Sequence, residues 1–295
     1  MTAPVFYIVD VFTDKKYTGN QLAVFRHPEN LSEADMQNLA REMNYSETTF
    51  ILSETERDGG YDVRIFTPES ELPFAGHPTL GTAYVIQREI LREKVENITL
   101  NLKAGKIPVK FSYDGDLPGE LWMHQLSPEF GPTFDRELFG RILNLDPADF
   151  DGRYPIQEVS TGTPFILVPL TSLNAVKKAS LNRELYFELV EKTASKAVFF
   201  FAPETCHPEN QLNARLFADY LGVHEDPATG SANGCLAGYL IRYHYFGGER
   251  IDIRVEQGYE INRPSLLKLR ADRSGDRIEV YVGGSVVMTA RGELV

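Results

Sequence analysis

The chain has 295 residues, 42% of them hydrophobic and 24% charged, which is enough for one large or two medium domains with well-filled cores. Its net charge of −12 is spread without long runs of like charge, which argues against a nucleic-acid partner. No apolar run is long enough to span a membrane, so no membrane partner is expected. The two cysteines are too few for a disulfide framework and the start does not resemble a leader, so a cytoplasmic protein is predicted.

The first part of the chain is expected to form strands around one amphipathic helix. Strands are predicted at residues 6–12, 21–25, 46–52, 61–66, 98–102, 107–113 and 120–126. Ser32 followed by Asp35 is typical of a helix capping box. The apolar face of that helix would consist of Met36, Leu39, Ala40 and Met43.

The segment from Phe74 to Ala83 predicts a loop that turns into a buried helix. Pro78 suits the first helical position and His77 the N-cap, and the helix should end near residue 92. Residues 79–86 are small or apolar nearly all round, as in a helix that runs through a core. Gly76 allows close approach to the backbone, and a helix N-terminus attracts a carboxylate or phosphate.

The proline-rich segment 127–134 is expected to be the domain boundary. We place the N-terminal half at residues 1–127 and the C-terminal half at 128–283, and leave open that the last strand, near 284–295, packs back onto the first half. Helices are predicted near residues 136–143, 182–192 and 232–245. Strands are predicted near residues 156, 165–169, 197–201, 212–217, 251–256, 266–269, 278–282 and 286–290.

Three features of the first half recur in the second half in the same order. Gly76 aligns with Gly230, each before a run of small and apolar residues. Upstream, residues 64–66 match 215–217, and residues 46–52 match 161–167. Chance similarity of short β-rich segments is the alternative. We infer two related halves, each a curved sheet or barrel around a buried helix whose N-terminus can face its partner across a cleft.

Glu47 is the sharpest candidate for catalysis. It lies at the start of a predicted strand, and its counterpart in the second half is Gly162, so the halves differ here by a carboxylate. A glutamate near a dry cleft can act as a general base or acid. The alternative is a solvated or hydrogen-bonded glutamate at a strand end.

The two helix starts supply the other candidates. Asp226 would be a second acid or base, would orient a proton-carrying group, or would be a capping aspartate. His77 would donate to a substrate carboxylate or transfer a proton near neutral pH, or would be a capping or core histidine. Gly76, Gly230 and Ser231 fit backbone donor positions for a substrate, and no Gly-x-Ser-x-Gly elbow supports Ser231 as a nucleophile.

Two other kinds of site are disfavoured by spacing. Gly76 and Gly81 have the spacing of a phosphate-binding loop, but Thr82 and Ala83 follow in place of the expected lysine and hydroxyl residue. The histidines show no metal-ligand spacing, so no metal site is predicted.

Several motifs together resemble the PhzF-like family of phenazine-biosynthesis isomerases. They are residues 44–50, 66–68, 72–78, 225–232, 257–258 and 263–265, with 10–12, 18–20 and 23–25 near the start. The resemblance runs from residue 5 to about 265. It implies an α+β, diaminopimelate-epimerase-like fold, in which two similar halves each wrap a β-barrel-like sheet around a central helix, with the active site between them.

The resemblance also implies a function. The family's phenazine enzyme isomerises dihydro-3-hydroxyanthranilate, so we expect an isomerase that moves a proton between carbons of a small carboxylate substrate, without a cofactor and as a homodimer. Glu47 would be the acid/base, while His77 and Asp226 set the charge balance and the substrate's orientation. Ser231 would lie in the substrate site, and Gly76 and Gly230 in the helix-start loops.

Two departures keep alternatives open. Related racemases on this fold use a cysteine at each helix start, whereas here Cys235 lies about one turn inside the second helix. Phe217 is followed by Ala218 and Asp219 where the phenazine enzyme has Ser-Pro. The alternatives are a racemase, epimerase or other proton-transfer enzyme on the same fold, or a non-catalytic protein that binds small carboxylates.

Overall fold

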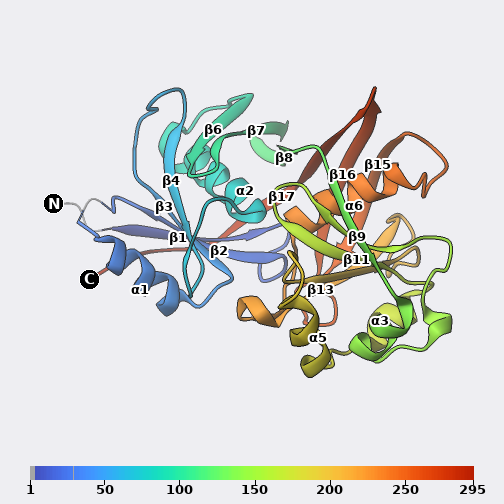
Figure 1. Cartoon of the computed structure of the whole chain (residues 1–295). Coiled ribbons are helices and arrows are strands. Elements are labelled where there is room, and N and C mark those ends of the chain that lie inside the picture. Colours follow the sequence, from blue (N-terminus) through green and yellow to red (C-terminus); the bar gives the residue numbers. More distant parts are fainter. Residues whose placement is uncertain (1–3, 29) are drawn as a thin grey trace. The chain divides into compact units, whose positions relative to one another are not determined.

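The computed structural model describes residues 4–28 and 30–295, and these form two compact units. Unit 1 contains the chain up to His124 together with Gly283–Val295, and unit 2 contains Gln125–Val282 (Figure 1). Residues 1–3, part of the start in which no leader is expected, lie outside the described chain. No helix among the described residues is both long and apolar enough to cross a membrane.

The strands of unit 1 close into a barrel. They pair in the order β17, β1, β2, β3, β4, β6, β7, β8, and β8 pairs in turn with β17. The short β5 pairs with β4. Their bounds are β1 (Val5–Val11), β2 (Asn20–Arg26), β3 (Glu47–Ile51), β4 (Tyr61–Phe66), β5 (Glu71–Leu72), β6 (Asn97–Leu102), β7 (Gly105–Asp114), β8 (Leu117–Gln125) and β17 (Arg277–Glu293).

Helix α2 (Gly76–Val85) packs against β1, β2, β3, β6 and β7, and all of its residues are buried, which confirms the predicted core helix. Gly81 leaves room there for neighbouring side chains, because a Cβ would lie 2.6 Å from Cδ2 of Leu22. The predicted N-cap was wrong. Ala75 keeps an extended backbone and is the N-cap, so His77 and Pro78 are the second and third helical residues. The helix continues as the π-helical η1 (Ile86–Leu91).

Helix α1 (Glu33–Met43) covers one side of this sheet. The predicted capping box between Ser32 and Asp35 is confirmed. Beneath the helix, the ring of Phe50 stacks on Phe25 at 5.1 Å and meets Phe66 edge-on at 5.5 Å. This aromatic cluster fixes β2, β3 and β4 beneath the helix, and β3 is the strand that carries Glu47.

Unit 2 repeats the arrangement with additional helices. Its sheet pairs in the order β9, β10, β11, β12, β13, β15, β16, and β14 pairs with β13. Its elements are β9 (Glu129–Phe134), α3 (Arg136–Leu143), η2 (Pro147–Asp149), β10 (Ile156–Ser160), β11 (Pro164–Pro169), α4 (Leu173–Lys178), α5 (Arg183–Val190), β12 (Val198–Ala202), β13 (Leu212–Ala218), η3 (Asp219–Leu221), β14 (Val223–Glu225), α6 (Gly230–Arg242), β15 (Arg250–Gln257) and β16 (Ser265–Ser274).

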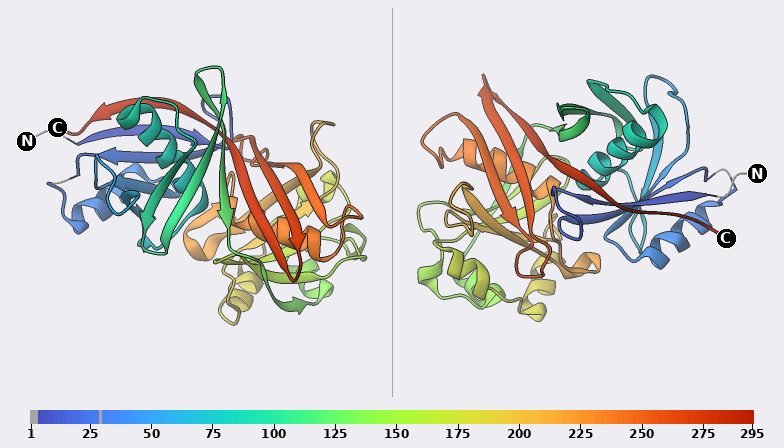
Figure 2. Two further views of the ribbon diagram at one scale, coloured as in Figure 1. Left: turned by 90° about the horizontal axis from the view of Figure 1, so that it is seen from above. Right: turned by 180° about the vertical axis from the view of Figure 1, so that it is seen from behind.

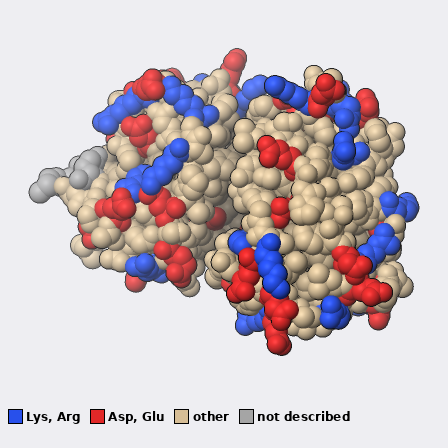
Figure 3. All heavy atoms as spheres, viewed as in Figure 1, with Lys and Arg blue, Asp and Glu red and all other residues tan. Residues whose placement is uncertain are grey.

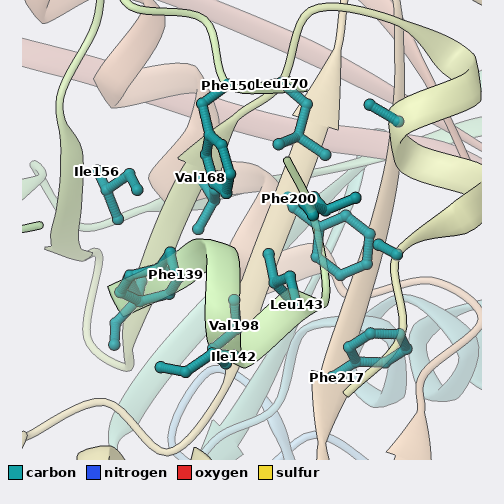
Figure 4. Packing of buried hydrophobic residues seen from close by; sticks show 14 of the residues in the cluster. Phe139, Ile142, Leu143, Phe150, Ile156, Val168, Leu170, Val198, Phe200 and Phe217 are labelled. Atoms are coloured by element: carbon teal, nitrogen blue, oxygen red, sulfur yellow. The ribbon is translucent and has the colours of Figure 1, made fainter. Parts of the chain in front are cut away.

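Helix α6 is the central helix of unit 2, and it packs against β10, β11, β15 and β16. The helices α3, α4 and α5 bury a separate apolar cluster against the sheet, in which Phe139, Ile142 and Leu143 lie near Val168, Val198 and Phe200 (Figure 4). Unit 2 thus has a second hydrophobic core beneath three outer helices, whereas the corresponding cluster in unit 1 lies beneath α1.

The segment expected to be the domain boundary, residues 127–134, contains a strand. Its residues 129–134 form β9, which pairs with β10 through an irregular register between Gln157 and Val159. Pro132 lies in that irregular stretch, where a missing N–H breaks no regular ladder. Pro128 packs on Gly238 of α6, where a Cβ would lie 2.6 Å from the proline ring. Pro132 is therefore accommodated within the sheet, and Pro128 contributes to the contact with α6.

The two predicted strands near the end of the chain are one long strand, β17. Its first residues, 277–282, belong to unit 2, and residues 283–293 belong to unit 1. Val5 of β1 lies opposite Glu293, and the amide of Leu294 donates to the Pro4 carbonyl at 2.9 Å. The described ends of the chain therefore lie side by side (Figure 2).

Acidic and basic side chains are interspersed over the face shown in Figure 3. Ion pairs join neighbouring elements of the fold, for example Lys103 with Glu71 and Lys178 with Asp149. The face in view therefore carries no extended basic patch of the kind that binds nucleic acid.

Replacing Phe50 by alanine should lower the free energy of unfolding by about 3–5 kcal/mol, because it opens a cavity in the aromatic cluster under α1. Phe246→Ala is the control, since that ring is 44% exposed and its removal should cost less than about 1 kcal/mol. Urea denaturation of both variants measures the difference. Equal losses would contradict the assigned core.

Candidate active site

In unit 1, the fold brings Glu47 and His77 together. Glu47 is the first residue of β3, and His77 lies in the first turn of α2. The Nε2 atom of His77 is 3.5 Å from Oε2 of Glu47. The imidazole is buried, while the Glu47 side chain is 17% exposed. The carboxyl group thus lies between a buried base and solvent.

The protonation of His77 follows from its burial. Burial lowers the pKa of the imidazole to about 3, so the ring is neutral around neutral pH. The ring also bonds to the backbone of Gln21, and Nε2 makes no hydrogen bond to any described residue, so Nδ1 is the donor to Gln21. In this tautomer Nε2 is an acceptor that faces Glu47. The pair can therefore hold one proton, on the carboxyl or between the two groups.

In unit 2, Gln257 holds the loop that leads into α6. Its Nε2 donates to the carbonyl of Asp226 at 2.9 Å. Its Oε1 accepts from the amide of Thr229 at 3.2 Å and from Nδ2 of Asn233 at 3.0 Å. The Thr229 hydroxyl donates to Oδ2 of Asp226 at 2.5 Å. The backbone and the carboxylate of Asp226 are thereby held by groups of β15 and of the loop itself.

Gly258 explains why the motifs around Gln257 and Asp226 occur together. Its φ of +79° is left-handed, and a Cβ would lie 2.4 Å from the Arg263 carbonyl oxygen and 2.6 Å from that of Pro227. Only glycine allows the chain after β15 to lie this close to the Pro227–Ala228 peptide. The close approach helps to fix the start of α6.

The starts of the two central helices differ from those of the other helices. Side chains of Ser32, Asp135, Ser172 and Asn182 cap α1, α3, α4 and α5. Within the described chain, α2 and α6 have no side-chain cap and no acidic residue in the first turn. Their first-turn amides, which include those of His77 and Ser231, lie at the positive end of the helix dipole, which in general attracts anions. Gly76 and Gly230, each the first helical residue, are both buried.

Cys235 is not placed for thiolate chemistry. It is buried in α6, where its sulfur lies 3.6 Å from both the Thr161 hydroxyl and the Thr163 carbonyl oxygen. Burial raises the pKa of this thiol to about 12, which keeps it protonated. Among the described residues, no group of three histidine, cysteine or acidic side chains could hold a metal ion.

Sequence reasoning missed Gln125 and Thr161. Gln125 donates to the Gly230 carbonyl at 3.1 Å and accepts from the Thr161 hydroxyl at 2.7 Å. A Cβ on Gly234 would lie 1.8 Å from Oε1 of Gln125, so that glycine makes room for the amide. The glycines inside a buried helix were the available signal, because they mark where another element approaches closely.

The family model of phenazine biosynthesis-like proteins, PhzC-PhzF, matches residues 9–292. The chain belongs to this family.

Relatives of the PhzC-PhzF family are similar over nearly the whole chain. An uncharacterised isomerase of Clostridium acetobutylicum is 33% identical over 98% of this chain and 97% of its own. A trans-2,3-dihydro-3-hydroxyanthranilate isomerase of Pseudomonas aeruginosa is 34% identical over 97% of this chain and 98% of its own. The chain is accordingly an isomerase-class enzyme of this family.

Solved structures confirm the predicted α+β, diaminopimelate-epimerase-like fold. A PhzF-family phenazine biosynthesis protein of Bacillus anthracis superposes with a TM-score of 0.91 at 26% identity, covering all of both chains. A probable proline racemase of Agrobacterium radiobacter, 12% identical, shares the fold with a TM-score of 0.64, covering 99% of this chain and 93% of its own.

The candidate residues fall into two groups within the family fold. Glu47, Gly76 and His77 lie in unit 1, and Asp226, Gly230 and Ser231 lie in unit 2. Asp226 is buried, and Ser231 is half-buried on the first turn of α6. The catalytic and binding roles of all six stay predictions.

Gly258→Ala should destabilise the protein far more than Gly247→Ala, although both glycines have a φ of +79°. A Cβ added at Gly247 would have no heavy atom within 4 Å. Gly247→Ala should therefore lower the free energy of unfolding only by the strain of a left-handed alanine, about 1 kcal/mol. Gly258→Ala adds a clash with two carbonyl oxygens and should lose at least about 2 kcal/mol more. Equal losses in urea denaturation would show that the close approach is not needed.

The low pKa of His77 predicts a loss of stability in acid. Between about pH 6.5, where a free histidine titrates, and about pH 3, the unfolded chain binds a proton that the folded chain does not. As the pH is lowered through this range, the contribution of His77 to the free energy of unfolding should therefore fall by up to about 1.4 kcal/mol per pH unit. His77→Gln should lose that part of the slope, and exposed His244→Gln should keep it. Parallel pH profiles for wild type and His77→Gln would refute the assignment.

Proposed function

We propose that this protein is a cofactor-independent isomerase that moves a proton between two carbons of a small, unsaturated carboxylate substrate. The observation that carries the proposal is the pairing of Glu47 with His77, whose Nε2 and Oε2 atoms are 3.5 Å apart. A carboxylate beside a neutral imidazole can take up one proton and give it back. Isomerase names among relatives more than 30% identical support this reaction class.

In the proposed reaction, the Glu47 carboxylate removes a proton from an activated C–H bond. The electron pair of that bond moves into the conjugated system of the substrate, and a second carbon then receives the proton from the Glu47 carboxyl group. While Glu47 is protonated, Nε2 of His77 accepts its hydrogen bond and keeps the acid oriented. General acid–base catalysis of this kind contributes about 10²–10⁴-fold, and positioning supplies the rest.

Binding of the substrate carboxylate is assigned to backbone amides at the helix starts. The uncapped first turns of α2 and α6, with Gly76 and with Gly230 and Ser231, are suited to an anion. Asp226 is assigned the charge balance and orientation of the substrate, because its backbone and carboxylate are both held in place. A protein that only bound carboxylates would have no use for Glu47 beside a buried base.

The substrate used to test the proposal is trans-2,3-dihydro-3-hydroxyanthranilate, which is named in the Pseudomonas aeruginosa relative. In D₂O, the wild type should convert it with deuterium entering the product, as followed by NMR. Glu47→Gln should lower kcat by about 10²–10⁴-fold, because the amide cannot accept the proton. Exposed Glu56→Gln is the matched control and should keep full activity.

Full activity of Glu47→Gln would overturn the assignment of the base. No turnover by the folded wild type would remove this substrate and direct the search to other cyclic or unsaturated carboxylates. Exchange of deuterium into the α-carbon of an amino or hydroxy acid would instead favour a racemase or epimerase.

A further inference from the structure

Each central helix is preceded by the same arginine–glutamate ion pair. In unit 1, Nε and Nη2 of Arg64 donate to the two carboxylate oxygens of Glu71 at 2.8 and 2.6 Å. In unit 2, the same atoms of Arg215 donate to Glu225 at 2.9 and 2.8 Å. Both glutamates lie five residues before the first residue of the central helix. We call these two bidentate pairs the loop forks.

The surroundings of the loop forks are duplicated as well. The glutamate pairs across the sheet with a phenylalanine in each unit, Phe66 with Glu71 and Phe217 with Glu225. Each guanidinium also lies 5.0 Å from the ring centre of that phenylalanine. Two independent surface ion pairs would not be expected to share donor atoms, strand register and ring contact.

Each loop fork lies on a short strand that leads toward a central helix. Strand β5 has only Glu71 and Leu72, and β14 has only three residues. The chain then enters the loops before Gly76 and Gly230, where neither helix start has a side-chain cap. An exposed ion pair contributes little, but these forks are bidentate, and both side chains of the unit 2 pair are less than a tenth exposed.

Each arginine also ties its fork to a peripheral helix. Arg64 donates to Glu33 in the first turn of α1 at 2.7 Å. Arg215 donates to the carbonyls of Val176 and Ala179 at the end of α4, at 2.8 and 3.1 Å. The fork is the same in both units while the anchoring helix differs. The shared feature is therefore the connection to the helix-start loop.

We propose that Arg64–Glu71 and Arg215–Glu225 are positioning pairs that fix the helix-start loops, so that the first-turn amides of α2 and α6 are pre-organised for an anionic substrate. This inference deepens the proposed function and rests on it for the identity of the bound group. The loop-fixing role itself stands on the geometry within each unit. Lysine cannot replace either arginine, because an ammonium group cannot donate two parallel bonds to one carboxylate.

Hydrogen exchange tests the loop-fixing role without any substrate. Arg64→Lys should raise native-state amide exchange in residues 73–79 by about tenfold, and Arg215→Lys should do the same in residues 226–232, each leaving the other loop unchanged. The control variants are Arg26→Lys and Arg153→Lys, which break bidentate pairs with Glu54 and Asp151 elsewhere in the same units. They should leave both loops protected. If an arginine variant does not fold, Glu71→Gln or Glu225→Gln replaces it in the same exchange experiment, with the same expected result.

Kinetics separate positioning from general stabilisation. With a substrate that the wild type turns over, Arg215→Lys and Glu225→Gln should each raise KM by about tenfold with little change in kcat. Their double variant should be no worse than either single, because both remove the same fork. The control variants should leave KM unchanged. A lower melting temperature with unchanged KM and unchanged loop exchange would reduce the forks to ordinary stabilising pairs and overturn the proposal.

The two proposals fail in different ways. If the wild type turns over no carboxylate, the proposed function fails, while loosened loops in the fork variants still support the positioning role. If turnover is normal but the fork variants show wild-type exchange and KM, the positioning role alone is wrong.

Discussion

The rest of the structure depends on burying a helix that has no polar face. Helix α2 is enclosed by a closed sheet along its whole length, and α6 takes the same place in unit 2. A helix buried in this way leaves backbone donors at its first turn, and a buried donor without a partner is costly. In α2 and α6 no side chain of the described residues caps that turn, so the fold itself creates two places suited to an anion.

The two units share a scaffold but differ in their reactive groups. The position that corresponds to Glu47 is Gly162, whose φ of +118° a glutamate would rarely adopt. Cys235 corresponds to Gly81 and is enclosed in its helix. The loop forks, in contrast, are retained almost atom for atom. The two units therefore share the geometry around their helix starts, while the carboxylate–imidazole pair is present in unit 1 alone among the described residues.

Much of this molecule could be predicted from local patterns. The capping box at Ser32, the apolar helix after Gly76 and the duplicated order of motifs all follow from neighbouring residues, and the comparisons confirm the fold that the motifs indicated. What local patterns could not supply depends on contacts between distant segments. The low pKa of His77 comes from burial, and the role of Gln125 comes from a packed glycine in α6. The strand at residues 129–134 could not be predicted, because the irregular register that accommodates Pro132 lies partly on the partner strand.

The last strand has a consequence for how the protein is made. Residues 283–293 of β17 supply the partner of β1 in unit 1, whereas unit 2 is the continuous stretch 125–282. On the ribosome, the first 124 residues emerge early but wait for the C-terminus before their barrel can close. Unit 2 is therefore complete in the growing chain before unit 1, although unit 1 begins first. A nascent chain stalled shortly before its end would expose the edges of β1 and β8, and these are the sites at which a chaperone would be needed.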